Sequence, residues 1–213
     1  MTLRWKIAQA LEIRWWRNYL RYKETENYLA AKKAYWQRVL TTLQFNVKPG
    51  EKILDAGCGP AGIFIILNEC VVDAVDPLLD KYEENLPHFK KSNYPYVQFY
   101  NQSLEDFIIK TSYNKVFCLN AINHVADLDK SLDKIVAATP TQGQLILSID
   151  VHKYSFLKYV FRAIPGDLLH PQQHDLQDYI KMLKQRGCNI VKKVNLKPGR
   201  IFDYYILVVE REG

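Results

Sequence analysis

A glycine-rich segment after an apolar run carries the residues best suited to bind a ligand and do chemistry. Residues 52–62 read KILDAGCGPAG, so an apolar stretch meets Asp55 and then glycines at positions 57, 59 and 62. Glycine allows positive φ and lets the backbone approach a ligand where a Cβ atom would collide; a third glycine lets a following helix pack closely on the strand. The segment predicts a buried strand, a nucleotide-binding turn and a helix.

The glycine spacing alone fits more than one interpretation. It matches the turn that seats the pyrophosphate of a nicotinamide or flavin dinucleotide on a helix N-terminus. Asp55 would repel a pyrophosphate, but it suits a ligand with a cationic sulfonium and an ammonium group. Pro60 removes a backbone N–H that a phosphate cradle would use. A tight turn with only a structural role is the third interpretation.

The segment resembles motif I of the class I S-adenosylmethionine-dependent methyltransferases, in which a hydrophobic strand runs into Asp/Glu-x-Gly-x-Gly. The likeness is to the small-molecule branch of that family, of methyltransferase type 11 or 12. It implies that S-adenosylmethionine is the cofactor and S-adenosylhomocysteine the product. It also implies cofactor contacts from the turn itself, namely from Asp55, Ala56, Gly57, Cys58 and Gly59.

Two later segments extend the resemblance. Residues 71–77 read as a second strand ending in Asp76 and Pro77, where an acid binds ribose hydroxyls in doubly wound folds; a simple turn role for Asp76 is the alternative. After a third strand at 97–100, Ser103 and Leu104 are expected beside the adenine ring. Many relatives place an acid near Gln102, so this chain departs from the pattern there. Ser103 also fits an ordinary helix cap.

A polar cluster follows the apolar run at residues 115–119 and resembles motif IV. Ligands bind beyond the carboxyl ends of the strands in an open parallel sheet, so Asn120, Asn123 and His124 are expected to face the transferable methyl group. Asn120 is counted with the cofactor contacts. The Asn/Asp-Pro-Pro-Tyr/Phe motif of enzymes that methylate adenine amino groups is missing.

The second half of the chain completes an α/β pattern. A helix is expected at 128–138, a fifth strand at 144–149, a helix at 176–186, and strands at 189–195 and 202–210. The last two strands are too close for a helical crossover and must be antiparallel neighbours. We therefore expect a three-layer, Rossmann-like fold with a seven-stranded sheet and a terminal antiparallel hairpin, which dinucleotide dehydrogenases lack. Two N-terminal helices precede it.

The N-terminal region holds the positive charge of the chain. Residues 1–50 contain ten Lys/Arg and three Asp/Glu, and they contain all four tryptophans. Apolar residues at three- and four-residue steps predict two amphipathic helices, with a stripe that runs from Trp5 through Leu11 and Trp15 to Tyr19. These helices would pack on the sheet edge and cap the cofactor pocket. Alternatively, the helices could bind an anionic acceptor, an acidic membrane surface or nucleic acid.

We divide the chain into an N-terminal helical extension (1–45) on the acceptor side and a class I methyltransferase domain (46–213), in which residues 151–175 form an acceptor-side insertion. That insertion carries several aromatic residues and two histidines, His170 and His174. If the acceptor must lose a proton, His124 is the first candidate for the base, and His174 or His170 the second, because histidine titrates near neutral pH.

Composition sets further bounds. Apolar stretches are too short for a membrane span and no cleavable leader pattern opens the chain, so we expect a cytoplasmic protein. The cysteines, Cys58, Cys70, Cys118 and Cys188, lack metal-site spacing and are expected to be reduced and structural. No metal site is predicted, although His170 and His174 share a spacing that could place both on one helix face.

The sequence therefore predicts a methyltransferase that acts on an O or N atom of a small-molecule acceptor, with an anionic or aromatic acceptor suited to the basic, aromatic helices. Two alternatives stay open. The basic N-terminal helices could serve an RNA or DNA methyltransferase, or the chain could bind S-adenosylmethionine or S-adenosylhomocysteine without catalysis. Neither the acceptor nor the oligomeric state follows from the residues.

Overall fold

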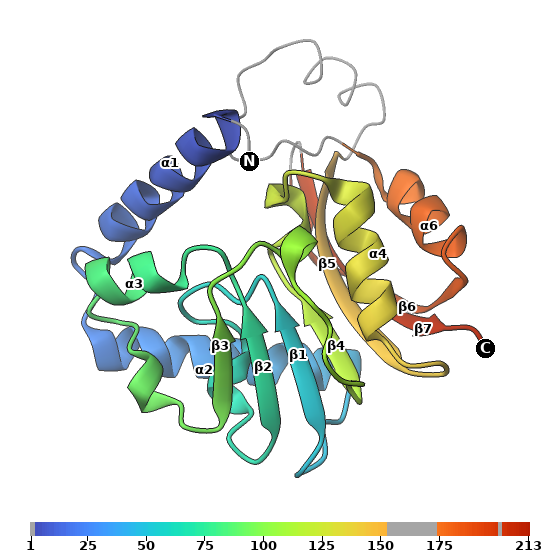
Figure 1. Ribbon diagram of the computed structural model, residues 1–213, viewed down its shortest axis with the longest axis horizontal. Helices are drawn as coiled ribbons and strands as arrows, with labels where there is room; N and C mark the ends of the chain where they lie inside the picture. Colours follow the sequence, from blue (N-terminus) through green and yellow to red (C-terminus); the bar gives the residue numbers. More distant parts are fainter. Residues whose placement is uncertain (1–2, 153–173, 200–201) are drawn as a thin grey trace.

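The computed structural model describes residues 3–152, 174–199 and 202–213, and it has three layers (Figure 1). The helices are α1 (Leu3–Leu20), α2 (Thr25–Leu43), α3 (Leu79–Asn85), α4 (Leu128–Ala138) and α6 (Leu176–Lys184). The strands are β1 (Lys52–Ala56), β2 (Val71–Val75), β3 (Val97–Tyr100), β4 (Lys115–Cys118), β5 (Gln144–His152), β6 (Cys188–Lys197) and β7 (Phe202–Arg211). Short 3-10 helices lie at η1 (Ile63–Ile66), η2 (Lys91–Asn93), η3 (Leu104–Asp106) and η4 (Ile122–His124).

The seven strands form one sheet in the order β3-β2-β1-β4-β5-β7-β6. Strands β1 to β5 are parallel, and β7 lies antiparallel between β5 and β6. This confirms the expected fold and its terminal hairpin. The carboxyl ends of the parallel strands therefore meet at one edge of the sheet, where ligands bind in folds of this kind.

Alternate residues of each strand serve opposite faces of the sheet, as the two-residue period of a strand requires. Ile53 belongs to one core, with the residues of α2, η1 and α3, whereas Leu54 belongs to the other, with those of α4 and α6. Both side chains are fully buried. The central strands are covered on both faces, which explains their continuous apolar runs.

The helix expected after the glycine turn is reduced to η1, a single 3-10 segment of four residues. Helix α2 fills the same layer and passes behind β1, β2 and β3 in Figure 1. Its Trp36, Val39 and Leu43 are buried there. The expectation that the N-terminal helices pack on the sheet edge is therefore wrong for α2, which covers a face and shares its core with β1. The division of the chain near residue 45 stays a prediction.

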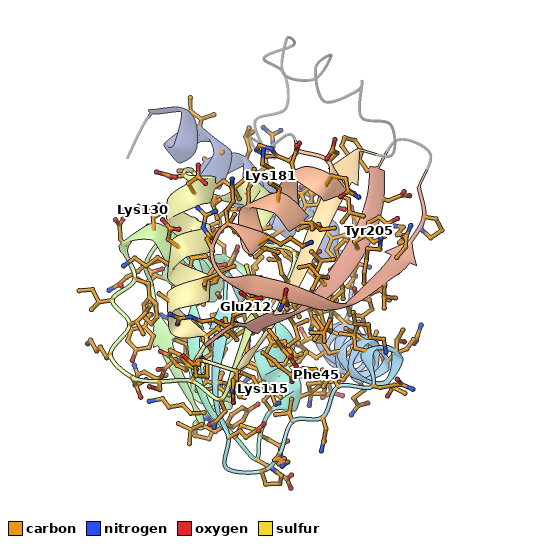
Figure 2. All side chains as sticks on the ribbon, turned by 90° about the vertical axis from the view of Figure 1, so that its right-hand side faces the viewer. Phe45, Lys115, Lys130, Lys181, Tyr205 and Glu212 are labelled. Carbon is orange, nitrogen blue, oxygen red and sulfur yellow. The ribbon has the colours of Figure 1, made fainter. Side chains whose placement is uncertain are left out.

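Contacts from two distant strands fix the end of α2. The Lys115 ammonium of β4 lies 4.6 Å from the ring centroid of Phe45, and both residues are labelled together in Figure 2. On β6, the Lys192 ammonium donates to the carbonyl of Leu43 at 2.9 Å. The last turn of α2 is thereby attached to the middle of the sheet and to its hairpin.

Helix α1 packs on the core with a different side from the one that the sequence predicted. The predicted apolar stripe is largely exposed, since Leu11, Trp15 and Tyr19 keep between 37% and 49% of their surface. Ile13, Trp16 and Leu20 pack on the core instead. No helix among the described residues is long and apolar enough to cross a bilayer. The four cysteines are all free and buried.

Candidate functional site

A cavity lies between α1, α2 and the carboxyl ends of β1, β2 and β4. The glycine turn forms its floor, and side chains from both N-terminal helices form the opposite wall. Eight of the ten residues predicted as cofactor contacts line it: Gly57, Cys58, Gly59, Asp76, Pro77, Ser103, Leu104 and Asn120. His124 lines it as well. The structure thus brings together residues spread over almost 70 positions of the chain.

Two glycines give the turn its shape. Gly57 has φ 72°, and a Cβ atom there would collide with the Cβ of Ala121. Its N–H donates to the carbonyl of Val75 at 2.7 Å, which closes the turn onto the end of β2. Gly59 has φ 57° and would meet no protein atom within 4 Å. Gly57 is therefore required by the protein's own packing, whereas Gly59 borders open space.

Asp76 joins the turn to the end of β2. One carboxylate oxygen accepts from the N–H of Gly59 at 2.9 Å, and the other accepts from the N–H of Leu78 at 2.8 Å. Asp76 therefore stabilises the turn and also lines the cavity. Burial raises the pKa of the Asp76 carboxyl to about 7, and the Glu12 carboxylate of α1 adds to the rise. Each oxygen of Asp76 keeps a lone pair for a ligand hydroxyl.

Asp55 and Ala56 lie beneath the turn and do not line the cavity. The Asp55 carboxylate is 1% exposed and accepts from the N–H of Phe64 at 3.1 Å. Burial raises its pKa to about 7, and backbone hydrogen bonds from Phe64 and Ile63 oppose the rise. A Cβ atom on Gly62 would lie 2.6 Å from Oδ2 of Asp55. The carboxylate therefore caps η1 and supports the turn, rather than pointing into it as the sequence suggested.

The segment after β3 borders the other end of the cavity. Ser103 caps η3, because its hydroxyl oxygen accepts from the N–H of Asp106 at 3.3 Å. Both proposed uses of Ser103, cap and cavity lining, therefore coexist. Glu105 also lines the cavity, and its Oε1 accepts from the N–H groups of Ala126 and Asp127. Glu105 lies outside the residues that the motifs predicted as cofactor contacts.

The polar cluster after β4 splits between two roles. Asn120 has φ 55°, a conformation that Asn tolerates, and its N–H donates to the Ser148 hydroxyl at 2.7 Å. Asn120 and the half-buried His124 line the cavity. Asn123 does not, because its amide is buried and exchanges hydrogen bonds with the backbone of Asp150 at 2.9 and 3.0 Å. Asn123 thus fastens η4 to β5, and its expected place at the methyl group is wrong.

Of the two other candidate bases, His174 is among the described residues, and it does not line the cavity. His174 precedes α6, with Nδ1 3.7 Å from Oδ2 of Asp178 and its ring against Tyr179. It is absent from the described cavity lining. His170 and the aromatic residues of the predicted insertion between 153 and 173 lie outside the described residues.

The N-terminal helices supply wall residues that motif reasoning missed. Gln9, Glu12 and Trp16 come from α1, and Lys32 and Trp36 from α2. Trp36 Nε1 donates to the carbonyl of Ala61 at 3.0 Å, and Tyr82 of α3 donates to Glu12 at 3.0 Å. For Gln9, Glu12 and Lys32, the signal in the sequence was that they are polar residues within helices predicted to be amphipathic. That signal does not reveal which strand loop the polar residues meet.

A groove continues the cavity along the same helices. It shares Lys32 and Asn120 with the cavity and is otherwise lined by α1, α2 and the link between them: Tyr19, Lys23, Glu24, Asn27, Tyr28, Ala31 and Tyr35. Burial lowers the pKa of the Lys32 ammonium, and Lys23 lowers it further. In the described part of the chain no carboxylate pairs with Lys32. The groove therefore combines tyrosine rings with an ammonium that lacks a counter-ion.

Comparisons with known proteins agree with this geometry. The family model of a methyltransferase domain matches residues 28–193. This chain belongs to the methyltransferase domain family. A search of the curated proteins found no match. Many solved structures are similar in fold to this methyltransferase.

The YcgJ protein of Bacillus subtilis superposes with a TM-score of 0.67 at 12% identity, over 84% of this chain and 98% of that one. Magnesium protoporphyrin IX methyltransferase of Synechocystis, with bound S-adenosylhomocysteine, superposes with a TM-score of 0.57 at 21% identity, over 87% of this chain and 84% of that one. The 1,6-didemethyltoxoflavin-N1-methyltransferase of Burkholderia thailandensis superposes with a TM-score of 0.60 at 13% identity, over 100% of this chain and 92% of that one. At these identities the likeness supports the class I methyltransferase fold.

Proposed function

We propose that this protein transfers the methyl group of S-adenosylmethionine to an O or N atom of a small molecule. The observation that carries the proposal is the charge of the cavity. Three carboxylates, Glu12, Asp76 and Glu105, line it against one ammonium, Lys32. Such a cavity disfavours a pyrophosphate and suits the sulfonium and ammonium groups of the methyl donor. Two of the similar structures named above are methyltransferases with S-adenosylhomocysteine bound.

Each part of the cofactor has a matching wall. Asp76 would accept from the ribose hydroxyls with its remaining lone pairs. The Gly57–Gly59 turn would lie beside the amino-acid part, where the open space at Gly59 leaves room. Ser103 and Leu104 would border the adenine ring. The Gln9 side-chain nitrogen is buried without a partner among the described residues, so a ligand oxygen would satisfy it.

The groove beside Lys32 is the proposed acceptor site. Its tyrosine rings suit a planar or aromatic acceptor, and the unpaired Lys32 ammonium suits a carboxylate or phosphate on it. In the transfer, the bond from the methyl carbon to sulfur breaks as the bond to the acceptor atom forms, and an acceptor O–H or N–H releases its proton. His124 would take that proton, because it lines the same cavity as Asn120, which also lines the groove.

Isothermal titration with S-adenosylmethionine and, separately, NAD tests the cofactor. We expect the methyl donor to bind and NAD not to bind. Asp76→Ala should weaken binding by roughly 10- to 100-fold, because hydrogen bonds to a charged acceptor contribute about 1.5–3 kcal/mol. Asp73→Asn is the control, since Asp73 is a buried carboxylate of β2, three residues before Asp76, that accepts from Tyr113 at 2.8 Å and does not line the cavity. Binding of NAD, or an equal loss in the control, would refute the assignment.

A second assay tests the acceptor site. With S-adenosylmethionine in excess, S-adenosylhomocysteine release is measured against phenols, aryl carboxylates and phosphate monoesters. We expect turnover with anionic acceptors, which Lys32→Met should weaken by raising KM with little change in kcat. His124→Gln should lower kcat and leave cofactor binding unchanged. Turnover of neutral acceptors alone, with Lys32→Met unaffected, would contradict the anionic preference.

A further inference from the structure

Helix α1 has two apolar faces, and only one of them serves the fold. Ile13, Trp16 and Leu20 pack on the core. On another side, Ile7, Leu11 and Trp15 recur every fourth residue and therefore lie along one line of the helix surface. They keep 44%, 37% and 49% of their surface, and Tyr22 just beyond keeps 90%. Large apolar side chains exposed in a row indicate an interaction surface.

The row leads directly to the proposed acceptor groove. Trp15 stacks on Tyr19, with ring centroids 4.9 Å apart and planes 7° apart. Tyr19 lines the groove, and the Lys23 ammonium lies 4.3 Å from the centroid of its ring. Whatever covers the apolar row would therefore lie at the mouth of the groove.

The charges around the row have a single sign. Arg14, Arg17 and Arg21 are exposed, and no carboxylate pairs with them within residues 3–152, 174–199 and 202–213. Glu12 is the one acid of α1, and it lines the cavity, where it accepts from Tyr82. The outward surface of α1 therefore offers apolar and cationic groups without acids.

We propose that α1 lies on a lipid bilayer that contains anionic lipids. Ile7, Leu11 and Trp15 would enter the boundary between headgroups and acyl chains, and the arginines would bind lipid phosphates, as in interfacial helices rich in basic residues and tryptophan. Nucleic acid fits less well, because Ile7 and Leu11 offer nothing to phosphates or base stacking. This docking does not depend on the proposed methyl transfer, but it would bring the groove to the bilayer surface.

Co-sedimentation with lipid vesicles tests the docking, using the full chain. Vesicles of phosphatidylcholine with about a third phosphatidylglycerol are compared with pure phosphatidylcholine, at low and high salt. We expect binding to the anionic vesicles that Leu11→Gln/Trp15→Gln weakens at least about tenfold, since both apolar side chains leave the interface. Arg14→Gln/Arg17→Gln should weaken it about fivefold per charge removed.

Ile108→Gln/Val191→Gln is the matched control, because Ile108 and Val191 are exposed apolar residues outside α1, at 67% and 55%. It should bind as the wild type does, and circular dichroism checks that every variant is folded. The proposal is wrong if the wild type ignores anionic vesicles or if the control loses binding equally. Tighter binding to a single-stranded RNA than to the vesicles, or a dimer in light scattering that Leu11→Gln/Trp15→Gln dissociates, would assign the surface to another partner.

Discussion

The two walls of the cavity are built in different ways. On the strand side, the lining carboxylates are fixed by backbone N–H groups: Asp76 by those of Gly59 and Leu78, and Glu105 by those of Ala126 and Asp127. Asp55, beneath the turn, is held in the same way by the N–H of Phe64. On the helix side, Glu12 meets another side chain, the Tyr82 hydroxyl, and Lys32 has tyrosine and tryptophan rings as neighbours. Backbone partners hold a group within a narrow geometry, whereas side-chain partners can change when a helix shifts.

This contrast assigns different tasks to the two walls. In the proposed site, the strand wall would carry what the transfer needs with any acceptor, a fixed binding site for the cofactor at the ends of β1 and β2. The helix wall carries the residues that extend into the groove, so it would select the acceptor. Substitutions on the strand wall should therefore change stability and cofactor binding together. Substitutions on the helix wall should change pH dependence or acceptor preference with little loss of stability.

Gly57→Ala tests the strand wall most severely. The new Cβ would collide with Ala121, and φ at residue 57 is positive. We expect a loss of roughly 2–4 kcal/mol in the free energy of unfolding, because overpacking adds to left-handed strain. S-adenosylhomocysteine binding should be lost with it. Urea unfolding and calorimetry measure the two effects.

Gly187→Ala is the control for Gly57→Ala. Gly187 has φ 67°, but a Cβ atom there meets no atom within 4 Å. It should cost only about 1–2 kcal/mol from backbone strain and leave cofactor binding intact. Equal costs at the two positions would mean that the contact with Ala121 does not constrain the turn.

Asp55→Asn tests the carboxylate under the turn through the pH dependence of stability. Burial raises the folded-state pKa of Asp55 to about 7, above the ordinary value of 3.8, so the folded state binds its proton more tightly than the unfolded state. The contribution of Asp55 to the free energy of unfolding is therefore at its maximum below about pH 4. It falls by up to about 4 kcal/mol as the pH rises to about 7. Asp55→Asn should remove this part of the decline in urea unfolding measured from pH 4 to pH 8.

The pKa of Asp76 is raised to the same range, so the free energy of unfolding of Asp55→Asn should still decline in part as the pH rises. Asp203→Asn is the control, because Asp203 is also buried and also accepts from a backbone N–H, that of Gly199 at 3.0 Å. It should keep the pH dependence of the wild type. If Asp55→Asn keeps the full decline, the Asp55 carboxyl titrates normally.

The strand wall could be predicted from the sequence because its geometry is local. Asp55, Gly57 and Gly59 lie within five residues, and parallel strands bring Asp76 to the same edge by their register, in which Ala56 pairs with Val75. Even here the glycine pattern misled once, since η1 replaces the helix expected after Gly62 and α2 fills that layer. A local pattern cannot reveal that a distant helix fills a layer.

The sequence predicted that the N-terminal helices cap the cofactor pocket, and both line the cavity. It could not show which of their residues form the wall, because α1 has apolar residues on more than one side. Leu11 and Trp15 have the spacing of a buried stripe, yet Trp16 and Leu20 face the core. Spacing alone cannot choose between two apolar faces of one helix, so Glu12 was not recognised as a cavity residue. The polar cluster after β4 has no periodic pattern, so the sequence did not distinguish Asn123, which holds β5, from Asn120, which borders the cavity.

Glu12→Gln tests the helix wall through its effect on Asp76. With the Asp76 pKa raised to about 7, the carboxylate form, which would bind the ribose hydroxyls in the proposed site, increases about tenfold from pH 6 to pH 8. We expect S-adenosylhomocysteine affinity to rise by a similar factor over that range. Glu12→Gln removes the neighbouring charge but keeps an oxygen for Tyr82, so the midpoint of the rise should move to lower pH. Calorimetry at several pH values measures both profiles, and identical midpoints would show that Glu12 does not act on Asp76.

Lys192→Met has the smallest expected effect and tests how the helix wall is held in place. The Lys192 ammonium donates to Leu43 at 2.9 Å and to the Gln44 side chain at 3.3 Å, at the C-terminus of α2. Its loss should cost about 1 kcal/mol of unfolding free energy, from a charge-assisted hydrogen bond and the helix dipole. Lys193→Met, at the exposed neighbouring position, should cost nothing measurable. Because Trp36 also ties α2 to the glycine turn, cofactor affinity should stay unchanged in Lys192→Met. A fall in affinity would instead mean that the hairpin positions the helix wall over the cofactor.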